Sequence, residues 1–363
     1  MVKHNKYKSN LKVNEGIPQP PSVNIESVVQ FKKQRQKKLH AEDYIKGILS
    51  GNRTLLSQAI TLVESSLISH HALANQIIEK CLPYSGNSLR IGITGVPGVG
   101  KSTFIEALGL YITGLGHKLA VLAIDPSSTR SKGSILGDKT RMEELSGHPD
   151  AYIRPSPSAG TLGGVARKTR ETIILCEAAG FDVVFIETVG VGQSEIAVHS
   201  MVDFFLLLML AGAGDELQGI KRGIMEMADV IAITKADGAN VEKANQAKAE
   251  YQHALHLFPK PESGWYPKVL TCSAYKNEGI DSIWKAIIDY KHTTTENGFF
   301  KKRRIKQAGY WMHETIMDQV KSHFYNNPSI KEQLHYFEKR VMEGDISSFN
   351  AAQQLLDEYF RRK

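Results

Sequence analysis

A glycine-rich stretch that follows a short apolar run limits the possible folds of this chain most strongly. Residues 95–103 have the form G-x-x-x-x-G-K-S, the apolar run is 89–93, and a helical pattern begins at Phe104. In such a loop, backbone N–H groups surround a phosphate at the positive end of a helix, and glycine permits the close approach. The stretch therefore predicts a nucleoside triphosphate site. Its residues are Gly95, Val96, Pro97, Gly98, Val99, Gly100, Lys101, Ser102 and Thr103.

Two side chains of this stretch carry the expected phosphate chemistry. Lys101 is expected to reach the β- and γ-phosphates, which makes it a candidate catalytic residue. Ser102 is expected to offer its hydroxyl to Mg²⁺ at the start of the helix.

The positive charge of the chain is concentrated at its start. Residues 1–40 hold nine Lys or Arg and two acidic residues, an excess that equals the net charge of +7 of the whole chain. The remaining residues are neutral in sum, which argues against a broad nucleic-acid-binding surface. We predict that residues 1–38 form a basic, disordered tail, which is either a solvated arm or a contact for an acidic partner.

Cysteine spacing and hydropathy favour a cytoplasmic protein. Cys81, Cys176 and Cys272 lie far apart, so neither a disulfide framework nor a zinc site is expected. No apolar run reaches the roughly 18 residues that a membrane span needs, and the N-terminus lacks the apolar core of a secretory signal. We expect no membrane and no nucleic acid among the partners.

From residue 89 onward, short β-branched runs alternate with helical patterns, which is typical of a parallel sheet with helices on both faces. The predicted fold is α/β, of the P-loop NTPase kind, with a helical segment before it and a helical extension after it. Ligands of such sheets bind beyond the carboxyl ends of the strands. The expected strands are 89–94, 119–124, 151–154, 182–187, 203–210, 229–234 and 268–272.

Four parts of the chain are expected. They are the tail 1–38, the helical segment 39–88, the nucleotide domain 89–292 and the helical extension 293–363. In the first helical segment, Gly51-Asn52 should end one helix and cap the next, and Ser69 should cap another. In the extension, the runs 330–341 and 349–360 read as helices after Pro328.

Two aspartates are candidate ligands of Mg²⁺. Asp125 ends the second expected strand, and Asp138 lies in the polar loop 129–141. Carboxylate oxygens suit a hard cation, and long loops without structure of their own are often functional. Either aspartate could instead be a turn residue.

An acidic residue closes the strand 182–187 and is followed three residues later by glycine. Glu187 is expected to hold Mg²⁺ and Gly190 to meet the γ-phosphate with its amide, as in the Walker B and γ-phosphate-sensing arrangement. Val191 stands where Ras-like proteins have the glutamine that orients the attacking water, so hydrolysis should be slow without a partner. Gln193 could substitute, although a surface position explains it equally well.

The base is expected at two later loops. Thr234, Lys235 and Asp237 follow the strand 229–234 in the pattern [N/T]-K-x-D, in which aspartate accepts hydrogen bonds from N1–H and the exocyclic amine of guanine. Losing such a paired contact costs on the order of 10⁴-fold in discrimination. The loop Ser273-Ala274-Tyr275 after the last strand would support the base from the other side. Together these loops predict GTP and GDP rather than ATP.

These motifs, in this order, resemble those of the MeaB/ArgK-type GTPases, the family that includes the human methylmalonic aciduria type A protein. The resemblance rests on 95–103, 125–128, 133–142, 187–195 and 212–221, and it runs from about residue 40 to the C-terminus. It implies a G-protein chaperone of adenosylcobalamin-dependent acyl-CoA mutases, notably methylmalonyl-CoA mutase. Such a chaperone gates cofactor loading and protects the mutase from inactivation.

The same resemblance implies two further features. Residues 212–221 would be a third switch loop that signals the nucleotide state to the mutase, although their acidic residues could equally begin a capped helix. Residues 293–363 would form a homodimer, for which Trp311, Phe324 and Phe337 are anchors of a suitable type. An extension that only packs against the core of its own chain is an equal alternative.

The sequence thus predicts a Mg²⁺-dependent GTPase that works as a switch on a mutase. Two alternatives remain open. A P-loop kinase of a small molecule or of a transport-binding protein would carry an acceptor pocket with a general base near the γ-phosphate. A metallochaperone GTPase would need a Cys/His cluster, which this sequence lacks.

Overall fold

The computed structural model describes most of the chain and divides it into two units. The described residues are 39–65, 67–124, 142–155, 162–188, 194–212 and 222–361. The first unit is Met1–His40 and the second is Ala41–Lys363. Every element below belongs to the second unit, whereas the tail expected at 1–38 lies outside the described residues.

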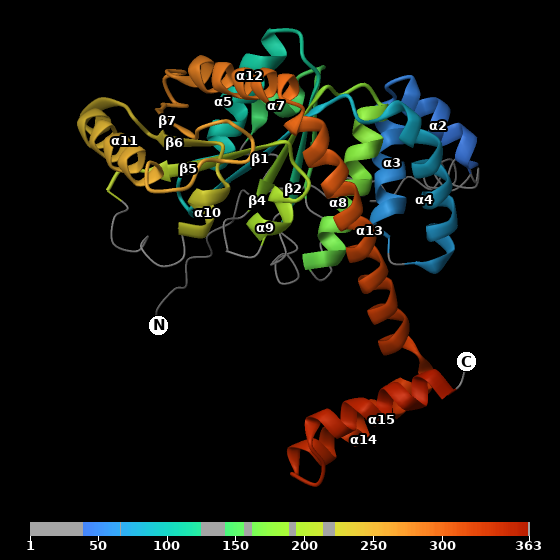
Figure 1. Cartoon of the computed structure of the whole chain (residues 1–363). Helices are drawn as coiled ribbons and strands as arrows, with labels where there is room; N and C mark the ends of the chain where they lie inside the picture. Colours follow the sequence, from blue (N-terminus) through green and yellow to red (C-terminus); the bar gives the residue numbers. More distant parts are fainter. Residues whose placement is uncertain are drawn as a thin grey trace, which may run out of the picture. The chain divides into compact units, whose positions relative to one another are not determined.

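Seven parallel strands form one sheet in the described part of the chain, in the order β3-β2-β4-β1-β5-β6-β7 (Figure 1). This confirms the parallel sheet that the sequence predicts. The strands are almost continuously apolar because both of their faces are buried. They are β1 Leu89–Gly95, β2 Leu119–Ile124, β3 Ala151–Arg154, β4 Val183–Thr188, β5 Phe204–Leu210, β6 Val230–Thr234 and β7 Lys268–Thr271.

Helices cover both faces of the sheet, so the core has two layers. On one face, α5 (Lys101–Gly114), α7 (Glu143–Gly147) and α12 (Ile280–Glu296) pack on β1 and its neighbours. On the other face, α10 (Arg222–Met227) and α11 (Val241–Leu255) pack on β5 and β6 (Figure 1).

Helices α8 (Leu162–Ala178) and α9 (Ser194–His199) pack on each other, α8 against β2 and α9 against β1 and β4. Behind α8 lies the N-terminal helical segment, made of α2 (Ala41–Leu49), α3 (Arg53–Glu64), α4 (Ile68–Cys81) and the short 3₁₀ turn η1 (Leu82–Tyr84).

The helix caps of this segment were predicted in part. Asn52 caps α3, since its side chain accepts from the N–H groups of Thr54 and Leu55. The cap expected at Ser69 is wrong. Helix α4 begins at Ile68, one residue earlier, and its N-cap position is Leu67, which makes no side-chain capping hydrogen bond.

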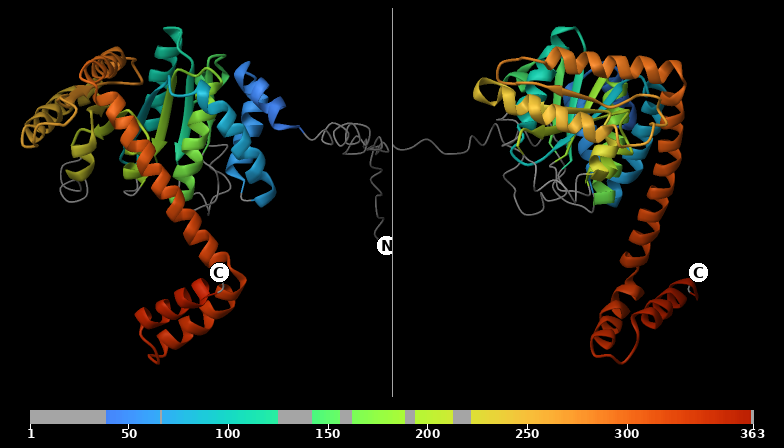
Figure 2. Two further views of the ribbon diagram at one scale, coloured as in Figure 1. Left: turned by 45° about the vertical axis from the view of Figure 1, so that its right-hand side comes forward. Right: turned by 60° about the vertical axis from the view of Figure 1, so that its left-hand side comes forward.

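The C-terminal extension is helical, as predicted. It consists of α13 (Phe299–Asn326), α14 (Pro328–Met342) and α15 (Ser348–Arg361). Helix α12 runs past residue 292, where the nucleotide domain was expected to end, and the chain turns into α13 at Gly298, whose φ is 75°. Figure 2 shows α13 leading on to α14 and α15, which pack on each other.

Side chains of α13 hold the turn 199–203, which lies between α9 and the start of β5. Trp311 donates from its indole Nε1 to the carbonyl of Ser200 at 3.0 Å, and Gln307 donates to the carbonyl of Val202 at 2.8 Å. Trp311 is therefore buried within the chain, and it is not the exposed interface anchor that its size suggested.

An arginine of α13 also bonds to this turn. Arg304 forms two hydrogen bonds to the carboxylate of Asp203, Nε to Oδ1 at 2.7 Å and Nη2 to Oδ2 at 2.6 Å. It also donates to the carbonyls of Gly86 and Ser88, just before β1. Because the side chain of Asp203 is only 1% exposed, its charge needs compensation, and Arg304 is its ion-pair partner.

Candidate functional site

The glycine-rich loop lies at the carboxyl end of β1, between β4 and β5, where ligands of parallel sheets bind. A side chain at Gly95 would place its Cβ 2.6 Å from the carbonyl oxygen of Leu208 on β5, so only glycine permits this packing. Gly98 and Gly100 have φ of 78° and 92°, which glycine alone adopts readily. The loop shape therefore depends on its three glycines.

Helix α5 begins directly after this loop without a side-chain cap. Its N-cap residue is Gly100, which makes no side-chain capping hydrogen bond. The first N–H groups of a helix attract an anion, and a phosphate is the anion that such a loop surrounds. Ser102 and Thr103 lie in this first turn, Ser102 half-buried and Thr103 exposed.

Lys101 lies over the loop. Its Nζ donates to the carbonyls of Gly95 at 2.9 Å and Val96 at 3.4 Å. Burial lowers the pKa of Lys101 below its usual value, and the carboxylates of Glu187 and Glu195 oppose this decrease. The amine thus lies in a partly dry site between the loop and two carboxylates.

Two of the expected metal ligands are described. Glu187 is half-buried near the carboxyl end of β4, paired in register with Ile93 of β1, so it lies beside the strand that leads into the loop with Ser102. A hydroxyl and a carboxylate are the oxygen donors that Mg²⁺ takes from proteins when phosphates supply further ligands. These donors fit that ion. The other expected residues, Asp125, Asp138 and Gly190, lie outside the described residues.

Within the described ranges, no three His, Cys, Asp or Glu side chains come together as a metal cluster would require. No helix in the same ranges combines the length and the apolar character needed to cross a bilayer.

The first base loop is bonded to the glycine-rich loop. Thr234, buried at the end of β6, donates from Oγ1 to the carbonyl of Val99 at 2.8 Å. Lys235 donates from Nζ to the carbonyl of Gly98 at 2.9 Å. Its φ is 55°, an unusual value for a residue with a side chain, and Asn240 supports it by donating to the Lys235 carbonyl at 2.7 Å.

The second base loop holds the first. Ser273, buried after β7, donates from Oγ to Oδ2 of Asp237 at 2.5 Å, and the carbonyl of Cys272 accepts from the amide of Ala236. Asp237 is half-buried, so its carboxylate is oriented but not enclosed. Ala274 and Tyr275 follow, and Tyr275 is 88% exposed.

The described site residues therefore converge at one edge of the sheet. The glycine-rich loop, Lys101, Ser102 and Glu187 come from the ends of β1 and β4, and the two base loops come from the ends of β6 and β7. Because Thr234 and Lys235 bond directly to the phosphate loop, the spacing between the phosphate and base sites is fixed. Such an arrangement can bind a nucleotide by both ends.

Sequence reasoning missed several residues of this region. Asn240, which supports Lys235, gave no signal beyond a turn-forming residue type. Thr94 and Thr188 are polar residues in apolar strands, which is the signal that could have identified them. Thr188 donates to Thr94 at 2.7 Å, and Thr94 lies 3.4 Å from Oε1 of Glu195, a residue noted in a motif but given no role.

Comparison with known proteins identifies relatives over most of the chain. A family model described as methylmalonyl-CoA mutase-associated GTPase MeaB matches residues 56–329. The GTPase ArgK of Escherichia coli is 50% identical over 311 residues, which cover 86% of this chain and 94% of that protein. The mitochondrial methylmalonic aciduria type A homolog of Mus musculus is 47% identical over 326 residues, 87% of this chain and 79% of that protein.

A solved structure agrees with these relatives. The crystal structure of a protein described as LAO/AO transport system kinase superposes with a TM-score of 0.70 at 40% identity, covering 88% of this chain and 97% of that chain.

Proposed function

The chain belongs to the MeaB family of methylmalonyl-CoA mutase-associated GTPases, and from this premise we propose that it is a GTP-hydrolysing switch acting as chaperone of an adenosylcobalamin-dependent mutase. In the proposal, the mutase is of the methylmalonyl-CoA type. The nucleotide state decides whether the mutase is loaded with cofactor and protected from inactivation.

The nucleotide part of this proposal rests on the hydrogen bonds between the first base loop and the glycine-rich loop. Thr234 and Lys235 donate to the carbonyls of Val99 and Gly98, while Ser273 orients the carboxylate of Asp237. An oriented carboxylate accepts hydrogen bonds from N1–H and the exocyclic amine of guanine, groups that adenine lacks in this arrangement. The Lys235 stem and the exposed Tyr275 ring would lie against the two faces of the base.

The phosphate part of the mechanism depends on Lys101 and the first turn of α5. The loop N–H groups and the Lys101 amine would hold the β- and γ-phosphates, and they offset the charge that develops when water attacks the γ-phosphoryl group in line. Ser102 and Glu187, with Asp125 and Asp138, would hold Mg²⁺. That ion, when bound, neutralises charge on the phosphates.

We propose that hydrolysis is slow until a partner binds. Val191 follows Gly190, and an apolar side chain cannot orient the attacking water. A partner would complete or stabilise the site, and it would sense the loops that the γ-phosphate holds, including 212–221. The mutase-associated description of the family and the methylmalonic aciduria homologues support a mutase as that partner.

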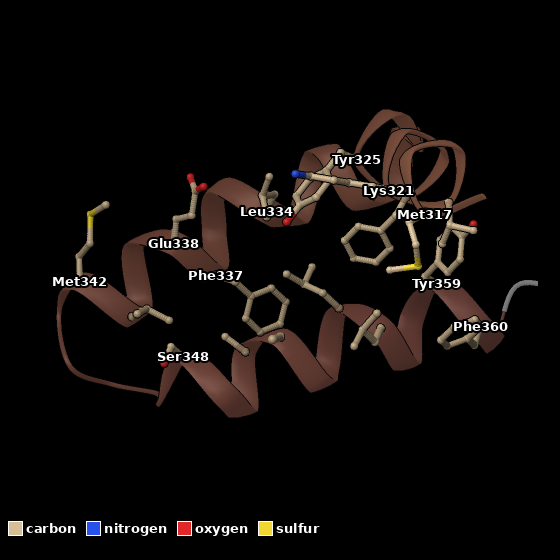
Figure 3. Close-up of a pocket in the computed structure, with 17 residues that line it drawn as sticks. Met317, Lys321, Tyr325, Leu334, Phe337, Glu338, Met342, Ser348, Tyr359 and Phe360 are labelled. Atoms are coloured by element: carbon tan, nitrogen blue, oxygen red, sulfur yellow. The ribbon is translucent and has the colours of Figure 1, made fainter. Parts of the chain in front are cut away.

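We also propose that the C-terminal extension forms a homodimer. Helices α13, α14 and α15 enclose an apolar groove of about 640 Å³. Figure 3 shows Phe337 pointing from one helix toward the other, with Met317 and Tyr359 farther along the groove. Met317 and Val320 are 66% and 55% exposed, and a second copy of the same helices would remove this apolar surface from water.

Phosphate release from GTP and ATP tests the proposed activity. The purified chain should hydrolyse GTP in the presence of Mg²⁺, lose activity with a chelator, and show little turnover of ATP. Equal use of ATP would contradict the guanine site.

The kinase alternative rests on the name of the structural relative alone. If the chain is a kinase, labelled γ-phosphate will appear on an acceptor molecule and not in solution. A cytoplasmic location, and the absence of membrane and nucleic-acid partners, stay predictions from the sequence.

A further inference from the structure

Three buried polar side chains are linked by hydrogen bonds in the apolar core, next to the start of the glycine-rich loop. Thr188 Oγ1 donates to Thr94 Oγ1 at 2.7 Å, and Thr94 Oγ1 donates in turn to Oε1 of Glu195 at 3.4 Å. The three residues are 0%, 1% and 1% exposed. A carboxylate in such surroundings is costly unless hydrogen bonds and opposite charge compensate it.

The three residues adjoin the three segments to which we assign GTP chemistry. Thr94 directly precedes Gly95, whose carbonyl accepts from Lys101. Thr188 directly follows Glu187, the proposed metal ligand. Glu195 is the second residue of α9, which begins right after residues 189–193. The hydrogen bonds among Thr188, Thr94 and Glu195 therefore join the ends of β1 and β4 to the start of α9.

The side chains around these hydrogen bonds are apolar. Gly92 of β1 lies against apolar side chains of the neighbouring elements, Val198 of α9 and Phe205 of β5. Apolar contacts permit small shifts, whereas a hydrogen bond fixes a distance and an angle. The Thr188–Thr94 bond of 2.7 Å joins the ends of β4 and β1, and the longer Thr94–Glu195 contact of 3.4 Å joins them to the start of α9.

We propose that Glu195 is a positioning residue for GTP hydrolysis, acting through Thr94 on the phosphate loop. By accepting from Thr94, it holds the start of this loop, and with it Lys101, in register with Glu187. This inference rests on the proposed GTPase function. It assigns Glu195 no contact with the nucleotide.

The position of Glu195 predicts a selective effect on turnover. Nucleotide affinity comes chiefly from the loop N–H groups and the base loops, whereas the hydrogen bond of Glu195 argued here is the one to Thr94. Turnover depends on the alignment of reacting groups, where a displacement of about 1 Å costs roughly 100-fold. We therefore expect Glu195→Ala to lower kcat by about 10- to 100-fold, while KM for GTP and the dissociation constant for GDP change by less than about threefold.

Three further variants separate positioning from a merely structural role. Glu195→Gln keeps an oxygen that accepts from Thr94, so it should return kcat to within about fivefold of the unmodified protein. Thr94→Val removes the donor without changing the shape, and it should reproduce the loss of kcat. Combined with Glu195→Ala, it should add little beyond the loss of the Thr188 hydrogen bond, since both variants remove the Thr94–Glu195 interaction. The control is Thr294→Val in α12, which also deletes a buried hydroxyl bonded to a backbone carbonyl and should leave kcat unchanged.

Each outcome decides the inference. Unchanged kcat in Thr94→Val, a loss that Gln does not restore, or a rise in KM with constant kcat would each overturn it. Thr94→Val keeps the test valid if Glu195→Ala fails to fold. Absence of GTP hydrolysis by the unmodified chain would be a different failure, because it would remove the proposed function itself.

Discussion

At the scale of single residues, Thr234 stands where guanine motifs commonly have asparagine, and its hydroxyl bonds to the glycine-rich loop. The carbonyl of Val99 lies 2.8 Å from Thr234 Oγ1, and that of Met209 lies 3.2 Å away. A short side chain reaches the phosphate loop because Thr234 is the last residue of β6 and lies directly beside that loop. Threonine in place of asparagine therefore loses an amide but keeps a hydrogen bond to the glycine-rich loop.

Asp237 provides the most specific residue-scale prediction. In Asp237→Asn, the side chain presents an amide N–H₂ where guanine also donates, so GDP affinity should fall by up to about 10⁴-fold. Affinity for xanthosine diphosphate should rise, because its 2-oxo group accepts where guanine donates. Fluorescence titration with both diphosphates measures this change. The control Asp281→Asn, on the exposed first turn of α12, should bind GDP normally, and unchanged GDP affinity in Asp237→Asn would contradict the assignment.

His199 provides a prediction on pH. Burial is the main cause, and the nearby Arg303 cation the smaller one, that lowers the pKa of His199 to about 3. The unfolded chain binds a proton at this residue below about pH 6.5, whereas the folded chain does not until about pH 3. The contribution of His199 to the free energy of unfolding therefore decreases as the pH falls below 6.5, by about 1.4 kcal/mol per pH unit.

Urea unfolding at several pH values measures this effect. His199→Leu should lose stability less steeply between pH 6.5 and 4.5 than the unmodified protein. The carboxyl of Asp229, whose pKa is raised to about 6 by burial, acts in the opposite direction, but it is present in both proteins and cancels in the comparison. His335→Leu, at a side chain that is 92% exposed, should keep the original slope, and a parallel slope for His199→Leu would refute the prediction.

At the scale of elements, the strands were predictable because parallel strands buried on both faces are continuous apolar runs. The expected run 182–187 and the observed β4, Val183–Thr188, differ by one residue at each end. The helices of the C-terminal extension were also predicted. The role of Trp311 was not, since its bond to Ser200 joins residues 111 positions apart, and local periodicity carries no information on such contacts.

The same limit applies to the candidate site. Motif spacing predicted that the loops of Lys101 and Asp237 belong to one site, because nucleotide chemistry needs particular residue types in a fixed order, and the structure brings the two loops together. Motif spacing could not identify Glu195, whose partner Thr94 lies 101 positions away. Long-range polar contacts inside the core follow from the fold and not from the sequence pattern.

The anchoring of α13 leads to a prediction on stability. Arg304→Met should lower the free energy of unfolding by about 3–5 kcal/mol, since it removes the ion-pair partner of the buried carboxylate of Asp203. Urea denaturation measures this. Lys306→Met, which changes a side chain that is 62% exposed on the same helix, should stay within about 0.5 kcal/mol. Similar small losses for both variants would show that the Arg304 contact contributes little.

At the scale of the whole molecule, the C-terminal groove predicts a dimer. Val320→Asp would place a charge among apolar side chains of α13, α14 and α15, so the variant should be monomeric. Light scattering after size exclusion measures the mass. Ser322→Asp, at an exposed residue of α13 outside the lining of the groove, should remain dimeric, and GTP turnover per chain should be unchanged in both. A dimeric Val320→Asp protein would place the interface elsewhere.

The central proposal is that bound GTP is a signal passed to a mutase. Its most direct test is the affinity of the purified chain for adenosylcobalamin-dependent methylmalonyl-CoA mutase, measured by calorimetry with GDP and with a non-hydrolysable GTP analogue. We predict binding whose dissociation constant differs at least tenfold between the two nucleotides, and a loss of this difference in Asp237→Asn with the same guanine nucleotides. No binding, or equal affinity in both nucleotide states, would contradict the account.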